Sequence, residues 1–496
     1  MTDLTPTRPR THHNALHQYA LAAAAFAAGW SLMMMEILGA RLMAPHFGYS
    51  VYQWGAIIGV VMTFMAAGYW TGGQLGDGPR AVPALRWALL AGTLAAALTP
   101  WLGKPMLADA AARLNAADGA VIGAALILGV PSFALAMVSP ICAGLSALSG
   151  AAAAGRIYAV GTVGSIGGTF FASFYAIPQV GVSAGYAIAA VLPALACAFV
   201  SGGKRMAAMA ALGVPLAWAA GYGEGREFAV YRETPHNTII VREDEREIRL
   251  HLNVLWATQS RLRKDGTPTG LYYDLFPAAP ALTGNPASGG KRVLVLGLAG
   301  GAAAKGILEA WPGADVLGVE LDPAVVEVAR SHFGLRPEVR VAVDDARRHV
   351  ETSTEQHDVV IVDLYSTAII PFFTATREFF EAVERRVAPG GIMLMNVASP
   401  QDRDTLVGPL AATQGAVFPS VFLADAGRGN YLLIATKERR TLDDVRVRLE
   451  DAPPQVAYAA RRILDGLTAA DTAGHPVLTD DRSDIDLRSL AALYGK

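Results

Sequence analysis

Cysteine is almost absent from this sequence of 496 residues. Its two cysteines, Cys142 and Cys197, both fall inside long apolar stretches. This excludes a disulfide framework, and no spacing of His, Cys, Asp and Glu typical of a metal site occurs, so we expect no metal. Basic clusters interleaved with aromatic residues are also missing, so nucleic acid is not an expected partner.

Charge is scarce in the first 220 residues. They hold ten Lys and Arg and five Asp and Glu, whereas the rest of the chain holds 31 and 38. The first part therefore has the composition of a protein region in lipid, and the remainder that of an ordinary, mildly acidic soluble domain. We expect a polytopic membrane domain over residues 1–222.

The apolar stretches are long enough to cross a bilayer, which takes about 20 residues per helix. Too many occur for a signal peptide followed by an anchor. Gly68/Gly72 and Gly164/Gly168 are GxxxG pairs, which allow close helix contact in lipid. The predicted spans are 18–43, 51–75, 83–102, 120–147, 156–177 and 183–201, with a weaker seventh at 206–222 that Pro215 interrupts.

Basic residues indicate the orientation. They gather in the N-terminal tail, at 80–86, at Arg156 and at Lys204 and Arg205, which places those segments in the cytoplasm. Others, at Arg41, Lys104 and Arg113, fall on the opposite side. Six spans leave the soluble part in the cytoplasm and seven leave it outside. We expect six, in a cell (inner) membrane.

Glu36 is an ionisable residue inside the first predicted span. Such a group is costly in lipid and usually faces a bundle interior or a cavity. It is either part of a cation path or substrate site, or a structural partner of a neighbouring helix. The sequence leaves both interpretations open.

From residue 223 the pattern changes to strands. The segments EFAVYRE, NTIIVRE and EIRLHLN alternate apolar and polar residues, which predicts a small antiparallel β region over 223–285. After the loop-like stretch 282–291, strands alternate with helices, which predicts an α/β Rossmann-like domain over 286–496, the fold to which class I S-adenosylmethionine-binding domains also belong. The predicted strands are 293–296, 315–320, 339–343, 358–363, 391–396 and 430–436.

Four polar or glycine-rich features follow successive strands of this sheet, where ligands of such folds bind. A glycine turn lets backbone approach a ligand, and acids after the next strands can accept from ribose hydroxyls and an adenine amine. The loop lacks the P-loop pattern, and Ala299 breaks GxGxxG, which favours a nucleoside without pyrophosphate. The residues are Gly297, Gly300, Gly301, Glu320, Asp344, Asp345 and Asp363.

Purely structural roles for these residues stay open as well. The glycines could serve a tight turn alone. Asp344 or Asp345 could be the N-cap of the helix that starts at ARRHV, since Asp is favoured there. Asp363 could be an ordinary residue at a strand end.

Several motifs together resemble the polyamine aminopropyltransferases, of which spermidine synthase is the familiar member. RETPHNTIIV (232–241), VLVLGLAGGAAAKGIL, GVELD, VDDARRHV and VLTDDRSDID (477–486) are similar to successive motifs of that family. The apolar part, with EILGARLMAPHFG and GRIYAVGTVGSIGGTF, is similar to the membrane region of fused spermidine-synthase-like proteins. The resemblance covers nearly the whole chain.

This resemblance implies roles for individual residues. Glu320 matches the ribose-binding acid, Asp345 the adenine-binding acid and Asp363 the first acid of the catalytic motif, with Tyr365 beside it. Asn237 stands at a family glutamine on the cofactor side. The co-substrate would be decarboxylated S-adenosylmethionine or S-adenosylmethionine, the acceptor an amine such as a polyamine, and the assembly a homodimer. Candidate substrate residues are Gln259, Tyr272, Tyr273 and Asp481.

The chain also departs from the family pattern. Gly300 stands where the soluble enzymes carry an Asp for the donor's ammonium, and Ser366 replaces the second acid of the catalytic motif. Three functions therefore remain open. They are aminopropyl transfer, which we favour, methyl transfer from S-adenosylmethionine, and transport or sensing of an adenosyl compound without turnover.

Overall fold

The computed structural model describes residues 13–47, 51–114, 116–146, 151–201, 227–284 and 290–494, with isolated positions between 202 and 226. The chain divides into two compact units, Met1–Glu224 and Gly225–Lys496. Each unit has its own hydrophobic core.

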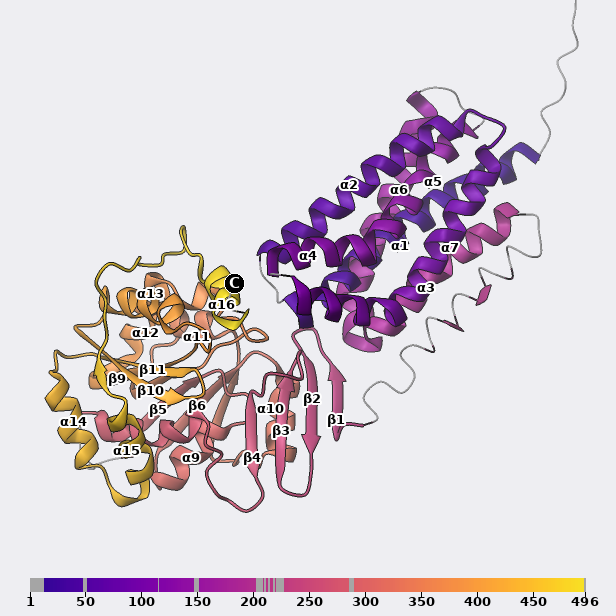
Figure 1. Cartoon of the computed structure of the whole chain (residues 1–496). Helices are drawn as coiled ribbons and strands as arrows, with labels where there is room; N and C mark the ends of the chain where they lie inside the picture. Colours follow the sequence, from indigo (N-terminus) through magenta and orange to yellow (C-terminus); the bar gives the residue numbers. More distant parts are fainter. Residues whose placement is uncertain are drawn as a thin grey trace, which may run out of the picture. The chain divides into compact units, whose positions relative to one another are not determined.

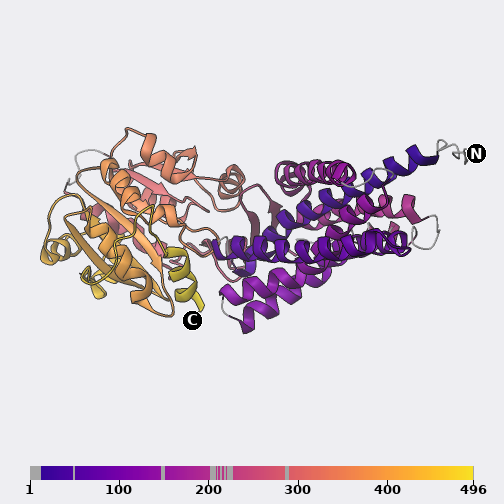
Figure 2. The ribbon, with the colours of Figure 1, turned by 90° about the horizontal axis from the view of Figure 1, so that it is seen from above.

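The first unit is a bundle of long helices that run side by side (Figures 1 and 2). Among the described residues, six stretches are long and apolar enough to cross a membrane, as the sequence predicts. The seventh candidate, 206–222, lies outside the continuously described segments. The helices are α1 (His13–Phe47), α2 (Val51–Gly76), α3 (Ala81–Arg113), α4 (Ala116–Ala124) with η1 (Ala125–Gly129) and α5 (Val130–Gly144), α6 (Ala151–Phe171) with η2 (Ala172–Val180), and α7 (Val182–Ser201).

Glycines let two helix pairs of this bundle approach closely. Gly164 and Gly168 of α6 lie against the backbone of α1, and a Cβ at either would overlap a carbonyl oxygen there. A Cβ at Gly72 of α2 would lie 2.6 Å from the carbonyl oxygen of Met137 in α5, and Gly68 is equally close to that helix. The close contacts predicted from the two GxxxG pairs are confirmed. Glu36 is partly buried within α1, and both interpretations of it stay predictions.

The second unit begins with a four-stranded antiparallel sheet in the order β1-β2-β3-β4. Its inward side chains, among them Ile239, Val241 and Leu250, pack on Val325 and Val328. The fourth strand was not predicted, because SRLR has no apolar alternation. The strands are β1 (Val230–Glu233), β2 (Thr238–Glu243), β3 (Glu247–Leu252) and β4 (Ser260–Arg263).

An eight-stranded sheet forms the body of this unit, in the order β12-β10-β11-β9-β8-β5-β6-β7. The five strands from β9 to β7 are parallel, whereas β11, β10 and β12 are antiparallel to their neighbours. The predicted α/β fold class is confirmed, although β10 and β12 were missed. The strands are β5 (Arg292–Leu296), β6 (Asp315–Glu320), β7 (Arg340–Val343), β8 (His357–Val362), β9 (Val387–Ala398), β10 (Ser420–Gly427), β11 (Asn430–Thr436) and β12 (Thr468–Ala469).

Helices cover both faces of this sheet (Figure 1). A hydrophobic core lies on each face of the sheet, and alternate residues of β5 pack into one or the other. Val293 and Val295 point to one face, and Leu294 and Leu296 point to the other. The helices are η3 (Tyr272–Leu282), α9 (Ala302–Ala310), α10 (Pro323–His332), α11 (Ala346–Thr352), η4 (Phe372–Thr374), α12 (Arg377–Arg386), α13 (Arg403–Gly415), α14 (Leu442–Glu450), η5 (Pro454–Val456), α15 (Ala457–Asp465) and α16 (Ile485–Tyr494).

The strand order reverses between β5 and β8. From β5 the chain moves outward to β6 and β7, and from β8 it moves in the other direction to β9. In a doubly wound sheet the crevice at such a switch point, beyond the carboxyl ends of the strands, is where ligands bind. The loops after β5 and β8 are therefore the place to look for a site.

Candidate functional site

The glycine loop after β5 is pressed against the end of β8. Gly297 has a φ of +89°. A Cβ at this position would overlap the carbonyl oxygen of Asp363, so no larger residue fits without moving a strand end. Ala299 has a φ of +46°, which costs an alanine about 1 kcal/mol relative to glycine. The loop is thus held in a strained shape by its neighbours.

Replacing Gly297 by Ala should loosen this part of the sheet. We expect a loss of more than about 2 kcal/mol in the free energy of local opening, because a backbone overlap adds to the strain of a positive φ. Amide hydrogen exchange of β5 and β8 measures it. Gly313→Ala is the matched control, since Gly313 has a φ of +93° but open space around its Cβ position, and it should cost only about 1 kcal/mol. Equal losses in the two variants would contradict the close contact.

Glu320 ends β6 and is 8% exposed. One carboxylate oxygen accepts from the backbone N–H of Ala299 (2.9 Å), and the other from that of Asp322 (3.2 Å). Burial raises the pKa of this carboxyl, while the two backbone N–H groups partly offset the shift. The acid is therefore tied directly to the glycine loop, at the edge of the sheet where a ligand would lie.

Asp344 and Asp345 both follow β7, but their side chains accept hydrogen bonds from different groups. Asp344 accepts from the guanidinium of Arg348 (2.9 Å), and its backbone N–H donates to the carbonyl of Glu320 (3.1 Å). Asp345 is the N-cap of α11 and accepts from the backbone N–H of Arg348 (2.9 Å). The capping interpretation thus holds for Asp345, and a carboxylate that caps a helix keeps further lone pairs for a ligand.

Asp363 directly follows β8 and has two side-chain donors. The hydroxyl of Tyr272 donates to one carboxylate oxygen and the side-chain amide of Asn396 to the other, both at 3.0 Å. Burial raises the pKa of Asp363 to about 6, even though both hydrogen bonds lower it. An acid with this pKa is largely ionised near neutral pH and can still take up a proton, as a general base must.

Asn396 was not predicted from the sequence. It lies in β9 beside the end of β8, is 1% exposed, and its side-chain oxygen accepts no hydrogen bond from the described residues. Its one sequence signal is a polar residue in the apolar run IMLMNVA. Only the parallel pairing of β8 with β9 shows that this residue stands next to Asp363.

The loop after Asp363 is tightly fixed. Tyr365 donates its hydroxyl to the carbonyl of Asn396 (3.2 Å) and accepts from the N–H of Ala398 (2.8 Å). Thr367, a β-branched residue, has a φ of +63°, which is a strained backbone. Gln259 braces it by donating to its carbonyl oxygen (3.0 Å). Tyr365 therefore supports the loop, and its hydroxyl bonds to the backbone of β9 and not to the carboxylate of Asp363.

Three other predicted residues lie apart from Asp363. Asn237 donates to Asp322 (3.1 Å) and so joins β2 to the start of α10. Tyr273 is 4% exposed and lies in the core against which its neighbour Tyr272 also packs, but only the hydroxyl of Tyr272 donates to Asp363. Asp481 is exposed on a turn, and it is the preceding acid, Asp480, that accepts from Arg347 (2.6 Å).

Position 300 is closed to larger residues. The backbone N–H of Gly300 donates to the hydroxyl of Ser260 (2.9 Å), and a Cβ at Gly300 would lie 2.7 Å from the Cβ of Ser260. Ser260 therefore fills the space into which a side chain at this position would project. An acid at this position would therefore require Ser260 and Phe333 to move.

Comparisons with known proteins show which sequences the second unit is similar to. The sequence model of the spermine/spermidine synthase domain matches residues 280–424, which run from η3 to β10 and include Glu320 and Asp363. The chain is 32% identical over 200 residues to a "Probable polyamine aminopropyl transferase" of Bifidobacterium longum, covering 40% of this chain and 42% of that protein.

A second relative covers more of the chain. The polyamine aminopropyltransferase of Mycobacterium tuberculosis is 29% identical over 308 residues, or 54% of this chain and 56% of that protein. The chain thus spans about half the length of the curated relatives it matches. A probable spermidine synthase of Corynebacterium glutamicum has a solved structure with a TM-score of 0.41 and 20% identity, covering 52% of this chain and 98% of that one.

Proposed function

We propose that the protein is an aminopropyltransferase, because its second unit matches the sequence model of the spermine/spermidine synthase domain and is similar to polyamine aminopropyltransferases. It moves an aminopropyl group from decarboxylated S-adenosylmethionine to a small amine, of the polyamine type. The observation that carries the proposal is Asp363, held by two donors at the switch point of the sheet, with a pKa of about 6.

The donor would lie across the carboxyl ends of β5, β6 and β7. Glu320 is placed to accept from both ribose hydroxyls, since each of its oxygens keeps a lone pair beyond its backbone bond. Asp344 and Asp345 are placed at the adenine end. Gly297 and Gly301, both with positive φ, let the loop backbone approach the nucleoside without an intervening side chain.

The transfer is a displacement at the carbon bound to sulfonium. The nitrogen lone pair of the acceptor forms the new C–N bond, the C–S bond breaks, and its electron pair stays on sulfur as a neutral thioether. The nitrogen must lose a proton, and Asp363 is the acceptor for it. The side-chain amide of Asn396 donates to Asp363 and holds this carboxylate in the orientation in which it accepts the proton.

The pH dependence of the reaction should reflect Asp363. Its carboxylate form accepts the proton, so kcat/KM should rise with pH and level off above about 6. The hydrogen bond from Tyr272 lowers this pKa, so Tyr272→Phe should move the rise to higher pH. Tyr273→Phe, at the neighbouring residue, is the control and should leave the profile in place. A profile that does not move in Tyr272→Phe would remove Tyr272 from this role.

Methyl transfer from S-adenosylmethionine is a second candidate, and the packing at Gly300 favours it. Ser260 fills the place where an acid could select the ammonium end of a decarboxylated donor. Without that acid, a donor that keeps its carboxylate meets no added repulsion there. Asp363 would serve this reaction in the same way, so the products, not the base, distinguish the two.

The other parts of the proposal concern the whole chain. Residues 1–222 form a membrane domain, 223–285 a small β region and 286–496 the catalytic domain, in the cytoplasm beside an inner membrane. The lipid bilayer and an amine acceptor are its partners, and the active assembly is a homodimer. No metal is invoked, and the described residues hold no group of three or more potential ligands.

Product analysis by mass spectrometry tests the function directly. The purified chain in lipid nanodiscs is offered putrescine, cadaverine or spermidine with each of the two donors. Methylthioadenosine together with an aminopropylated amine supports aminopropyl transfer. S-adenosylhomocysteine with a methylated amine supports the second candidate, and neither product, with donor still bound, would contradict both.

A further inference from the structure

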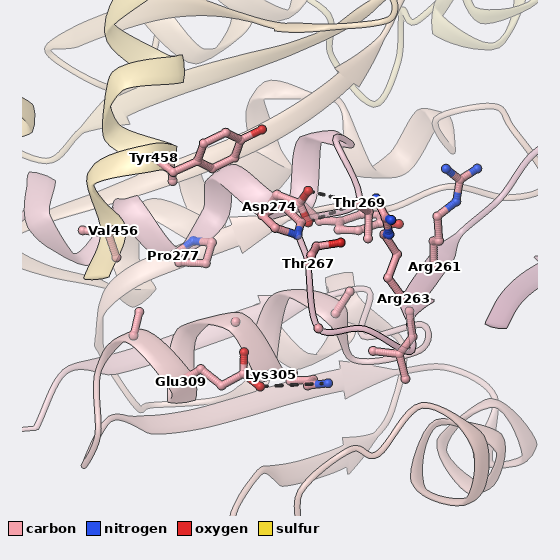
Figure 3. Close-up of a pocket in the computed structure, with 18 of the residues that line it drawn as sticks. Arg261, Arg263, Thr267, Thr269, Asp274, Pro277, Lys305, Glu309, Val456 and Tyr458 are labelled. Atoms are coloured by element: carbon pink, nitrogen blue, oxygen red, sulfur yellow. Dashed lines mark hydrogen bonds and ion pairs between the residues drawn. The ribbon is translucent and has the colours of Figure 1, made fainter. Parts of the chain in front are cut away.

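A cavity of about 350 Å³ lies beside Gly300 of the glycine loop, and Glu320 does not line it (Figure 3). Its walls come from β4, the loop after it, η3, α9 and α15, and Gly300 contributes to the lining. None of the acids at the switch point lines it: Glu320, Asp344, Asp345 and Asp363 all lie elsewhere. It is therefore a second site, separate from the one proposed for transfer.

Cations from two elements line this cavity. Arg261 and Arg263 come from β4, and Lys305 comes from the facing side of α9 (Figure 3). Two acids also line it, but Asp274 already accepts from the hydroxyl of Thr269 (3.0 Å) and the backbone N–H of Gly270 (2.7 Å). The net charge of the lining is positive, so a cationic amine would be repelled and an anion attracted.

These cations can turn toward a ligand without leaving an acid unpaired. Arg261 lies 3.5 Å from Glu247, which has a closer partner in Arg249 at 2.7 Å. Arg263 pairs with an exposed acid, Asp265, at 3.0 Å. That acid also accepts from the backbone N–H and the hydroxyl of one threonine, so it remains satisfied without the arginine. Exposed pairs of this kind contribute little stability.

The third cation is held even more loosely. Lys305 and Glu309 are 3.9 Å apart, one turn from each other on α9, and Glu309 is 60% exposed. An oxyanion with more than one charge would bind Lys305 more strongly than this single distant carboxylate does.

Part of the lining is apolar or aromatic. Phe333, Pro277 and Val456 contribute to it, and the ring of Tyr458 stands on the side opposite the two arginines (Figure 3). A cavity of this size that combines apolar and polar walls can hold a small molecule with a charged and an organic part. The paired donors of an arginine side chain fit the oxygens of a phosphate group.

From these contacts we infer that the cavity binds a small organic phosphate. Its phosphate group contacts Arg261, Arg263 and Lys305, and its organic part lies toward Tyr458 and Phe333. The ligand also touches the loop at Gly300, whose N–H is bound to Ser260. The inference is independent of the reaction proposed above, because it concerns binding at a different set of residues.

Calorimetry on the full chain in phosphatidylcholine nanodiscs tests this, with glycerol 3-phosphate as the probe and glycerol as its uncharged counterpart. We expect saturable binding of the phosphate alone, weakened at least about tenfold in Arg263→Gln/Lys305→Gln, because two charge-assisted contacts are lost. Arg446→Gln is the matched control. Arg446 has a similar exposure, pairs with Asp443 and lies outside the cavity, so its replacement should change nothing.

A phosphate group could also come from a lipid. If nanodiscs containing phosphatidic acid raise the melting temperature of the wild type but not of the double variant, the cavity binds a phosphate headgroup, which supports the inference. Two results would overturn it. One is the absence of any effect of either phosphate source, and the other is equal binding by the wild type and the double variant.

Discussion

Replacing Asp363 by Asn should lower turnover by about 10² to 10⁴-fold, while the affinity for the adenosyl donor stays unchanged. The amide cannot take the proton that leaves the attacking nitrogen. It also turns one –NH₂ toward either Tyr272 or Asn396, both of which donate to the carboxylate. Single-turnover kinetics and equilibrium binding of the donor, measured on the same preparation, give the two quantities.

Asp358→Asn is the control for this variant. Asp358 lies near the other end of the same strand, β8, and accepts from the backbone N–H of Arg292 (2.9 Å). Its replacement should leave turnover unchanged, so any loss in the Asp363 variant cannot come from a general weakening of β8. Unchanged turnover in Asp363→Asn would remove this residue from the reaction.

The sequence predicted the two-part architecture because each part follows a simple physical rule. The first part has almost no charge in stretches of helix length, and the second alternates strands with helices. Runs such as VLVL and VVIV are apolar at every position, as expected for strands buried on both faces. These runs became β5 and β8, the two strands that flank the switch point.

Glu320 and Asp363 could be predicted because each is the last residue of a predicted strand. Parallel strands bring their carboxyl ends to one edge of the sheet, so the order along the chain is enough to gather these acids. No such rule applied to Asn396. Its proximity to Asp363 depends on the pairing of β8 with β9, and a strand residue carries no sign of which neighbour it will have.

The contacts that hold the loops after β5 and β8 could not be predicted from the sequence either. Ser260 contacts Gly300, and Gln259 contacts Thr367 across 108 residues of sequence. Both depend on β4, whose sequence SRLR is too polar and too short to be recognised as a strand. A contact of Arg347 shows the same limit, because this arginine binds Asp480 and not the adjacent Asp481. Two adjacent acids look alike in sequence, and only the position of Arg347 decides which one is bound.

Replacing Glu320 by Gln should weaken donor binding by roughly tenfold to a hundredfold, because one charge-assisted hydrogen bond contributes about 1.5 to 3 kcal/mol. The carboxylate accepts from Ala299 and Asp322 and would accept from the ribose as well. An amide keeps one acceptor oxygen and turns an –NH₂ toward one of these backbone donors. Fluorescence or calorimetric titration with S-adenosylmethionine and its decarboxylated form measures the change.

The control for this variant lies on the same strand. Asp315 is the first residue of β6, is exposed, and pairs with Arg340 at 2.9 Å. Asp315→Asn removes a carboxylate from the opposite edge of the sheet, so donor affinity should not change. The two variants therefore separate a specific contact from a general effect of charge on β6. If Glu320→Gln bound both donors as tightly as the wild type, the nucleoside could not lie along the ends of β5 and β6. The proposed role of Asp363 would then fail too, because it requires a donor bound at this edge of the sheet.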